Sequence, residues 1–180
     1  MKATGIVRRI DDLGRIVIPK EIRRTLRIRE GDPLEIFTDR EGKVILKKYS
    51  PIGELGTLAG IYADSLSKTL DCTVCITDTD QVIAAAGNGK KELQEMLLSA
   101  ELAEVFQKRK TVLKKSSDAE FVAITKDRSE YSEEIISVIL SEGDIAGGVI
   151  FLQKNEKKHF GEMEKKFAAG AADLLGRQLS

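Results

Sequence analysis

The chain has 180 residues, of which 42% are hydrophobic and 32% charged, as in a globular protein of one ordinary domain or two small ones. Its apolar runs are far shorter than the roughly 20 residues that span a bilayer. It starts without a signal-peptide pattern, and it contains only two cysteines. This composition excludes a disulfide-stabilised scaffold, and we expect a cytoplasmic protein that binds no membrane.

Charge is distributed unevenly along a chain that is formally neutral, with 29 basic and 29 acidic residues. Residues 1–50 carry 13 Lys and Arg against 8 Asp and Glu, whereas residues 51–180 carry 16 against 21. Clustered guanidinium groups attract phosphate, and they also fit base edges in the major groove of DNA. The N-terminal segment is therefore expected to bind double-stranded DNA. The alternative is a solvated basic surface with local ion pairs.

The first fifty residues are predicted to form two strands, a short helix and a hairpin. The expected elements are strands over residues 3–10 and 15–18, a helix from Pro19 that ends at Gly31-Asp32-Pro33, and strands over residues 34–38 and 43–47. So small a module buries too little surface to be stable alone, and this one has no Cys or His for a disulfide or a metal. We therefore expect it to form a two-fold dimer.

Three stretches of this segment carry a recognisable pattern. They are Thr4-Gly5-Ile6-Val7-Arg8, Leu13-Gly14-Arg15-Ile16-Val17-Ile18-Pro19 and Glu21-Ile22-Arg23-Arg24-Thr25-Leu26. The pattern covers residues 1–50 and resembles the N-terminal domain of the AbrB-type transition-state regulators. The resemblance implies a β-rich swapped-hairpin barrel in which two chains interleave their strands. It also implies that arginines at the positions of Arg8, Arg15, Arg23 and Arg24 carry DNA binding.

Two further arginines belong to the same basic segment, so the candidate set has six members. These candidate arginines are Arg8, Arg9, Arg15, Arg23, Arg24 and Arg27. Between Lys2 and Arg29 there are nine basic residues against three acidic ones, an excess that local ion pairing cannot absorb. Which of these arginines contact bases and which contact phosphates is left open.

Residues 51–56 contain one proline and two glycines and are expected to be a linker to a second domain over residues 57–180. The first half is expected to contain a helix over 58–70, a hairpin of 73–77 and 81–85, and a helical segment over 90–110 broken near Ser99. Loops are expected over 114–120 and 126–134, followed by a hairpin of 135–140 and 145–152 and a helix over 160–174. This order predicts an α+β domain with an antiparallel sheet and flanking helices. It resembles a GAF domain in its topology.

The two resemblances in tandem imply a tetrameric transcription regulator, activator or repressor, that acts on genes of the developing spore and associates with the nucleoid. Dimers would form through residues 1–50, and the first and last helices of the GAF-like domain would join them into a homotetramer. That domain would also be the place for a small-molecule effector. An alternative is an antitoxin-type DNA-binding autoregulator whose C-terminal region binds a partner protein, although residues 57–180 have the pattern of a folded domain.

Residues 57–180 show no pair of a nucleophile and a base and no set of metal ligands, so we expect neither an enzyme nor a metal or cofactor site. Cys72 and Cys75 have the spacing of a metal or redox site, but tetrahedral zinc needs four ligands and His159 is the only histidine. Ordinary strand residues are expected there, with a redox switch as the alternative. The pair Gly147-Gly148 is expected to mark a β-bulge or, alternatively, the close approach of a ligand.

Overall fold

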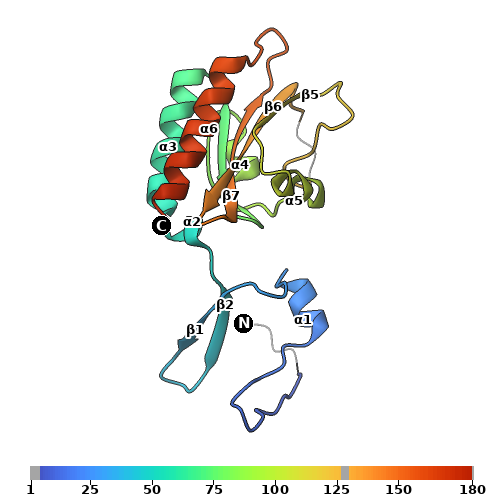
Figure 1. The fold of residues 1–180 in the computed structure, drawn as a ribbon, viewed down its shortest axis with the longest axis vertical. Coiled ribbons are helices and arrows are strands. Elements are labelled where there is room, and N and C mark those ends of the chain that lie inside the picture. The colour runs from blue at the N-terminus through green and yellow to red at the C-terminus, as the bar shows by residue number, and fades with distance from the viewer. Residues whose placement is uncertain (1–4, 127–129, 180) are drawn as a thin grey trace. The chain divides into compact units, whose positions relative to one another are not determined.

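The computed structural model describes residues 5–126 and 130–179, and the chain divides into two compact units between Tyr49 and Ser50. The first unit contains helix α1 (Lys20–Thr25) and a hairpin of the antiparallel strands β1 (Leu34–Thr38) and β2 (Val44–Lys48) (Figure 1). Asp39 closes the hairpin turn, because its carboxylate accepts hydrogen bonds from the N–H groups of Glu41 and Lys43, each at 2.9 Å. The hairpin predicted in this segment is therefore present.

Residues 5–19 contain no strand, so the strands predicted over 3–10 and 15–18 are absent from the described part of these ranges. Residues 3 and 4 lie outside the described residues. A strand forms only against a hydrogen-bonding neighbour, and in the single chain these residues are paired with none that is described. The expected swapped-hairpin barrel would supply that neighbour from a second chain.

Helix α1 ends at Thr25, well before the Gly31-Asp32-Pro33 segment that was expected to end it. Arg27 adopts a left-handed conformation with φ 54°, and the N–H of Ile28 donates to the carbonyl of Arg23 at 2.8 Å. This closure is of the Schellman type and satisfies a terminal helix carbonyl without a glycine. Because Arg27 stands where glycine is usual, the sequence does not indicate that the helix ends here.

The second unit is built on a five-stranded antiparallel sheet in the order β4-β3-β7-β6-β5. Its strands are β3 (Thr73–Thr77), β4 (Val82–Ala86), β5 (Val112–Lys115), β6 (Glu133–Ser141) and β7 (Asp144–Gln153). Its helices are α2 (Pro51–Glu54), α3 (Gly56–Leu70), α4 (Lys90–Leu93), α5 (Ala100–Gln107) and α6 (Glu162–Arg177). The long helices α3 and α6 lie side by side on one face, and α4 and α5 lie on the other (Figure 1).

Each face of this sheet has its own apolar core, because successive residues of a strand point to opposite faces. Along β6, Ile135 packs in the core beneath α3 and α6, whereas Ile136 packs in the core on the side of α5. Phe151 and Ile150 of β7 divide between the two cores in the same way. The two hairpins and the two long helices predicted for this domain are thus present, and the helical segment over 90–110 is broken at Ser99, which caps α5.

Residues 51–54 form α2 and Gly56 begins α3, with a turn at Leu55 between them, where the sequence suggests a linker. The side chain of Ser50 accepts a hydrogen bond from the N–H of Gly53 at 3.1 Å and donates one to Asp78 at 2.8 Å. Ile52 is fully buried in the core beneath α3 and α6. Proline at the first position of a helix and a serine N-cap favour a helical turn, so the same residues that resemble a linker start α2.

Strand β5 overlaps the loop predicted over 114–120 at Lys114 and Lys115, and β6 overlaps the loop predicted over 126–134 at Glu133 and Glu134. Lys114 pairs with Glu134 and Lys115 with Glu133 across the ladder. Charged side chains in both stretches mask the alternation expected of a strand, which is why neither was predicted to be one. An edge strand rich in lysine is common, since lysine discourages pairing with further chains.

The pair Gly147-Gly148 does mark a bulge, and the close approach at this point is made by protein backbone. The register of β6 and β7 shifts between Ile139 and Leu140, next to this pair. A Cβ atom on Gly147 would lie 1.9 Å from the carbonyl oxygen of Thr77 in β3. Only glycine allows the two strands to lie so near each other.

Candidate nucleic-acid interface and ligand cavity

The turn before Pro19 holds Arg15 in a defined position. One carboxylate oxygen of Asp11 accepts hydrogen bonds from the N–H groups of Leu13 (3.0 Å) and Arg15 (2.8 Å), and the other accepts from Arg15 Nε (2.8 Å). These bonds, first of all the backbone N–H of Arg15, hold the pKa of Asp11 below its ordinary value. Because a guanidinium has five N–H donors, one bond to Asp11 leaves most of them available to a ligand, and the Arg15 side chain is 69% exposed.

Three candidate arginines are exposed and form no ion pair with any described residue, namely Arg8, Arg9 and Arg24. Arg23 is half-buried on α1, and its Nε is buried without a hydrogen-bond partner among the residues that the structure describes. Arg27 lies in the turn that closes α1. The structure thus places all six candidate arginines within one unit, on the segment before Pro19 and on or just after α1.

The β1–β2 hairpin is tied to the end of α1 by polar contacts. Lys48 Nζ lies 3.0 Å from a carboxylate oxygen of Asp32, and it also lies 3.4 Å from the carbonyl oxygen of Arg27. The carboxylate of Asp32 also accepts a hydrogen bond from the N–H of Arg29 at 2.7 Å. These bonds position the turn that carries Arg27 and fix where α1 stands on the hairpin.

The first unit has almost no core of its own. Among residues 5–49, the part of this unit that the structure describes, only Pro19 is buried. Many of its large apolar side chains are instead exposed: Ile6, Val7, Ile10, Leu13, Ile16, Val17, Leu26, Ile36, Phe37, Val44, Ile45 and Leu46. An apolar surface of this kind in so small a unit is typical of a chain that folds against a partner.

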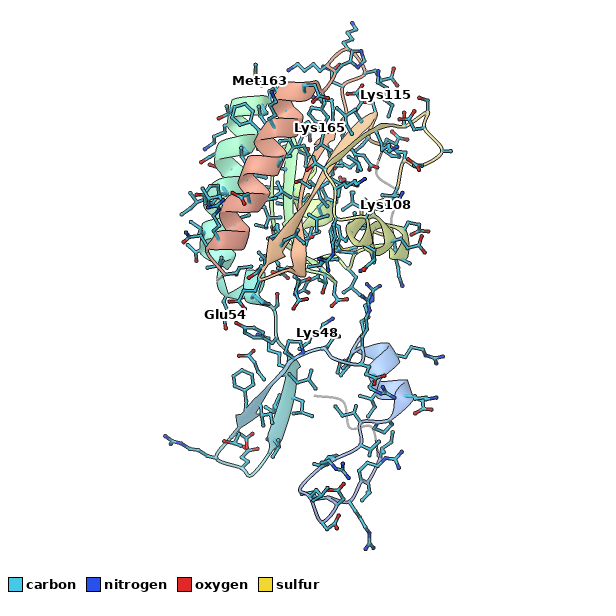
Figure 2. All side chains as sticks on the ribbon, viewed as in Figure 1. Lys48, Glu54, Lys108, Lys115, Met163 and Lys165 are labelled. Atoms are coloured by element: carbon cyan, nitrogen blue, oxygen red, sulfur yellow. The ribbon has the colours of Figure 1, made fainter. Side chains whose placement is uncertain are left out.

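The long helices of the second unit also expose apolar side chains. Small residues face the sheet, with Ala59 and Ala63 of α3 fully buried, whereas Ile61 is 59% exposed. On α6, Ala168 is buried, while Met163 (Figure 2) and Phe167 are 67% and 44% exposed. Ile61, Met163 and Phe167 therefore lie at the surface of the unit, whereas Tyr62, Leu66 and Leu70 of α3 pack against its core.

The second unit contains a cavity of about 370 Å³ on the side of the sheet opposite α3 and α6. Its wall includes Ser116, Asp118, Phe121, Val122, Ala123, Ile124, Tyr131, Glu134 and Leu152. Glu134 of β6 is fully buried, and one of its carboxylate oxygens accepts a hydrogen bond from the N–H of Val122 at 3.1 Å. Its other oxygen, Oε2, is buried with no hydrogen-bond partner among the described residues. Because the sequence predicts a loop over residues 126–134, Glu134 had no predicted role.

Burial raises the pKa of Glu134 to about 7, against the smaller lowering effects of the Val122 N–H and the charge of Lys114. The pKa of its neighbour Glu133, on the other face of the sheet, is lowered instead. Burial alone would raise the pKa of Glu133, but the N–H of Phe160 (2.7 Å) and the imidazole of His159 (2.7 Å) hold it below its ordinary value. Perturbed carboxylates in a cavity wall are frequent at functional sites.

The described residues contain no group of three potential ligands that could hold a metal ion. Cys72 and Cys75 are both reduced and buried, one in each core, and burial raises the pKa of each thiol to about 12. Thiols so protonated are poor nucleophiles, which argues against a redox switch. Within the described ranges, no helix is both long and apolar enough to cross a bilayer.

Comparisons with known proteins cover both units. Residues 54–180 match the family described as "Stage V sporulation protein T C-terminal, transcription factor", and residues 7–54 match "Antidote-toxin recognition MazE, bacterial antitoxin". The chain is 51% identical over 183 aligned residues to stage V sporulation protein T of Bacillus subtilis (strain 168), with 99% of each protein covered. It is 67% identical over 51 residues to the transition state regulatory protein AbrB of the same organism, covering 28% of this chain and 52% of that protein.

The fold of the second unit is that of solved GAF domains. The GAF domain from Acinetobacter phosphoenolpyruvate-protein phosphotransferase superposes with a TM-score of 0.59 at 14% identity, over 74% of this chain and 84% of that one. A cyanobacteriochrome receptor PixJ structure gives a TM-score of 0.57 at 14% identity, over 72% of this chain and 97% of that one. The GAF-like fold expected from the order of elements is confirmed, as is the AbrB-type character of the N-terminal segment.

Proposed function

The chain belongs to the stage V sporulation protein T family, and from this premise we propose how its two units regulate transcription. It is a sporulation transcription regulator with an AbrB-type DNA-binding domain and a GAF-like domain. Residues 1–50 bind double-stranded DNA in the cytoplasm, and residues 57–180 assemble the protein and respond to an effector. The protein acts by occupancy of DNA and not by catalysis.

Two chains interleave their first units into one swapped-hairpin barrel. The observation that carries this proposal is that Pro19 is the only buried residue among residues 5–49, although the segment is rich in large apolar side chains. A partner chain would bury these side chains, and it would also give residues 6–10 and 15–18 the strand neighbours that they lack. The dimer then presents two copies of each candidate arginine to the duplex.

The six candidate arginines bind this duplex. Arg15 is held at the turn by Asp11, and Arg24 stands exposed on α1, so guanidinium groups from two elements face outward with donors to spare. Helical and turn arginines of this kind can contact phosphates and base edges alike. Most of the affinity is expected to come from phosphate contacts and hence to depend steeply on salt.

The helices α3 and α6 join two such dimers into a tetramer. Ile61, Met163 and Phe167 are the exposed apolar residues on these helices that a second copy would cover. Replacing Phe167 with glutamate is expected to leave a DNA-binding dimer, since this side chain stands outside both the barrel and the core of its own unit. The mass of the variant in solution can be measured by light scattering, and a tetramer would contradict the assignment of this surface.

The decisive experiment for DNA binding compares two variants of equal charge. Arg15→Ala/Arg23→Ala removes two candidate arginines per chain, whereas Arg40→Ala/Lys47→Ala removes two exposed basic residues of the β1–β2 hairpin outside the candidate set. Affinity for a pool of labelled random-sequence duplexes is measured over a salt series. The first variant should bind far more weakly, with a salt slope smaller by about 0.9 for each phosphate that it no longer neutralises. Full affinity in that variant would refute the proposed interface.

The match of residues 7–54 to an antitoxin family favours a second candidate, an autoregulator whose C-terminal part binds a toxin. Residues 50–180 form a unit with two apolar cores, however, and a segment that folds on a toxin would be disordered when free. Limited proteolysis separates the two functions. A stable fragment that starts near Ser50 supports the regulator with a sensing domain, and complete digestion of this region supports the antitoxin.

A further inference from the structure

Glu134 has a carboxyl oxygen that the described protein leaves without a partner. Its carboxylate lies in the wall of the 370 Å³ cavity and is fully buried, with one oxygen bonded to the N–H of Val122 and Oε2 bonded to no described residue. A buried polar atom without a hydrogen-bond partner destabilises the fold, and a charged one does so more strongly. Such a group persists in a folded protein when something else, such as a ligand, satisfies it.

The nearest basic side chain does not neutralise this carboxylate. Lys114 on the neighbouring strand β5 acts on Glu134 only through space, and its ammonium is engaged by the carboxylate of Glu120. No lysine or arginine belongs to the wall of the cavity as described, whereas Asp118 adds a second carboxylate to it. Lys154 Nζ lies 5.2 Å from the centre of the Tyr131 ring and 3.7 Å from a carboxylate oxygen of Glu92, outside the wall itself. The charged groups of the described wall are both carboxylates, which favours a cation over an anion.

The rest of the wall combines apolar side chains with polar groups such as Ser116. Phe121, Val122, Ile124 and Leu152 contribute aliphatic and aromatic surface, and Tyr131 contributes a ring. A volume of about 370 Å³ lies near the lower end of the range for small-molecule sites, which are typically apolar with a few placed polar groups. The matching ligand has a compact apolar body and one positively charged end.

We propose that this cavity binds a small organic amine whose protonated ammonium group donates a hydrogen bond to Oε2 of Glu134. The proposal rests on the effector-sensing role given above to the GAF-like domain and names the chemical class of the effector. The ammonium supplies both the missing hydrogen-bond donor and the missing positive charge, and the apolar body fills the space beside Phe121 and Leu152. A neutral alcohol of the same shape would supply only the donor, and a carboxylate would be repelled.

The test uses three probes of nearly equal size on the full chain, namely benzylamine, benzyl alcohol and benzoate. Their binding is followed by ligand-detected NMR at pH 8, where Glu134 is mostly ionised. A hydrogen bond to a charged group is worth about 1.5–3 kcal/mol, so benzylamine should bind roughly 10- to 100-fold more tightly than benzyl alcohol. Equal binding of the three probes, or no saturable binding of benzylamine, would overturn the proposal.

Two variants test whether the carboxylate of Glu134 is the group that binds the amine. Glu134→Gln keeps an acceptor for the N–H of Val122 and should abolish the preference for benzylamine, while binding of benzyl alcohol stays the same. Glu101→Gln, which removes an exposed carboxylate of α5 outside the cavity wall, should keep the preference and is the matched control. An unchanged affinity of benzylamine for Glu134→Gln would sink the assignment.

A second measurement on the unaltered chain does not depend on how the variants fold. The pKa of Glu134, read from the ¹³C shift of its carboxyl carbon, should fall when benzylamine is added, because a bound cation favours the ionised form. A pKa that stays the same contradicts the proposal. DNA binding is measured on the same samples, so that failure of the amine test with DNA binding intact refutes the ligand class alone, whereas loss of DNA binding by the unaltered chain refutes the proposed function.

Discussion

Replacing Glu134 with glutamine is expected to stabilise the free protein at alkaline pH and to change its stability little at pH 5. Burial raises the pKa of this carboxyl from 4.5 to about 7, so the folded chain binds the proton more tightly than the unfolded chain does. Stability contributed by the bound proton is fully present below pH 4.5, and it is lost as the pH rises to 7. Glutamine is neutral at every pH and avoids this loss.

The size of the effect follows from the shift. One pKa unit corresponds to about 1.4 kcal/mol, so the ionised carboxylate costs the fold about 3 kcal/mol at pH 8. The Glu134→Gln variant should therefore exceed the unaltered protein by up to about 3 kcal/mol in the free energy of unfolding at pH 8. Glutamine still accepts a hydrogen bond from the N–H of Val122, but its amide N–H groups take the place of the unpartnered Oε2, so this figure is the upper end of the gain.

Urea denaturation at pH 5, 6, 7 and 8 measures this effect, with the protein concentration held fixed because assembly adds to the apparent stability. Glu133→Gln is the matched control, one residue away on β6 and equally buried. It loses the charge-assisted bonds to His159 and to the N–H of Phe160, so it should be less stable than the unaltered protein at pH 7. A Glu134→Gln effect that is the same at pH 5 and at pH 8 would refute the reasoning.

Three further outcomes are expected. Gly147→Ala should lower the free energy of unfolding by at least about 2 kcal/mol, since its Cβ would lie 1.9 Å from the carbonyl oxygen of Thr77; an unchanged thermal midpoint would contradict this close approach. Ser99→Ala should cost about 1 kcal/mol in urea denaturation, because Ser99 caps α5, and no loss would show that the cap is dispensable. Cys72 and Cys75 should resist a chromogenic disulfide reagent at pH 8 in the folded chain and react in urea, so rapid reaction of the folded chain would contradict their burial.

The sequence was most informative where local chemistry decides the structure. Turn residues and β-branched runs predicted the hairpins, and Ser99 marked the helix break, because these signals act within a few residues. The AbrB-type pattern singled out Arg15, and the structure adds that Asp11 holds it at the turn. That contact spans only four residues, so the sequence could have indicated it.

Other features depend on contacts that the sequence does not reveal. Strand β5 exists because it pairs with β6, which comes much later in the chain, and its lysines hide the strand pattern. Glu134 is buried because three other parts of the chain surround it, namely β5, residues 121–124 and β7. A run of polar residues in the sequence does not reveal this burial. Residues 5–19 have no strand neighbour among the described residues, so the strands predicted there would need a partner outside the single chain.

The neighbouring carboxylates of β6 connect the cavity on one face of the sheet to the start of α6 on the other face. Glu134 opens onto the cavity, whereas Glu133, one peptide bond before it, binds the N–H of Phe160 and the ring of His159 just ahead of α6 on the opposite face. Because the two residues are adjacent, a displacement of the strand backbone at Glu134 also displaces the backbone of Glu133. A ligand that displaces β6 at the cavity would therefore also displace the hydrogen bonds of Glu133 just ahead of α6, the helix that exposes Met163 and Phe167.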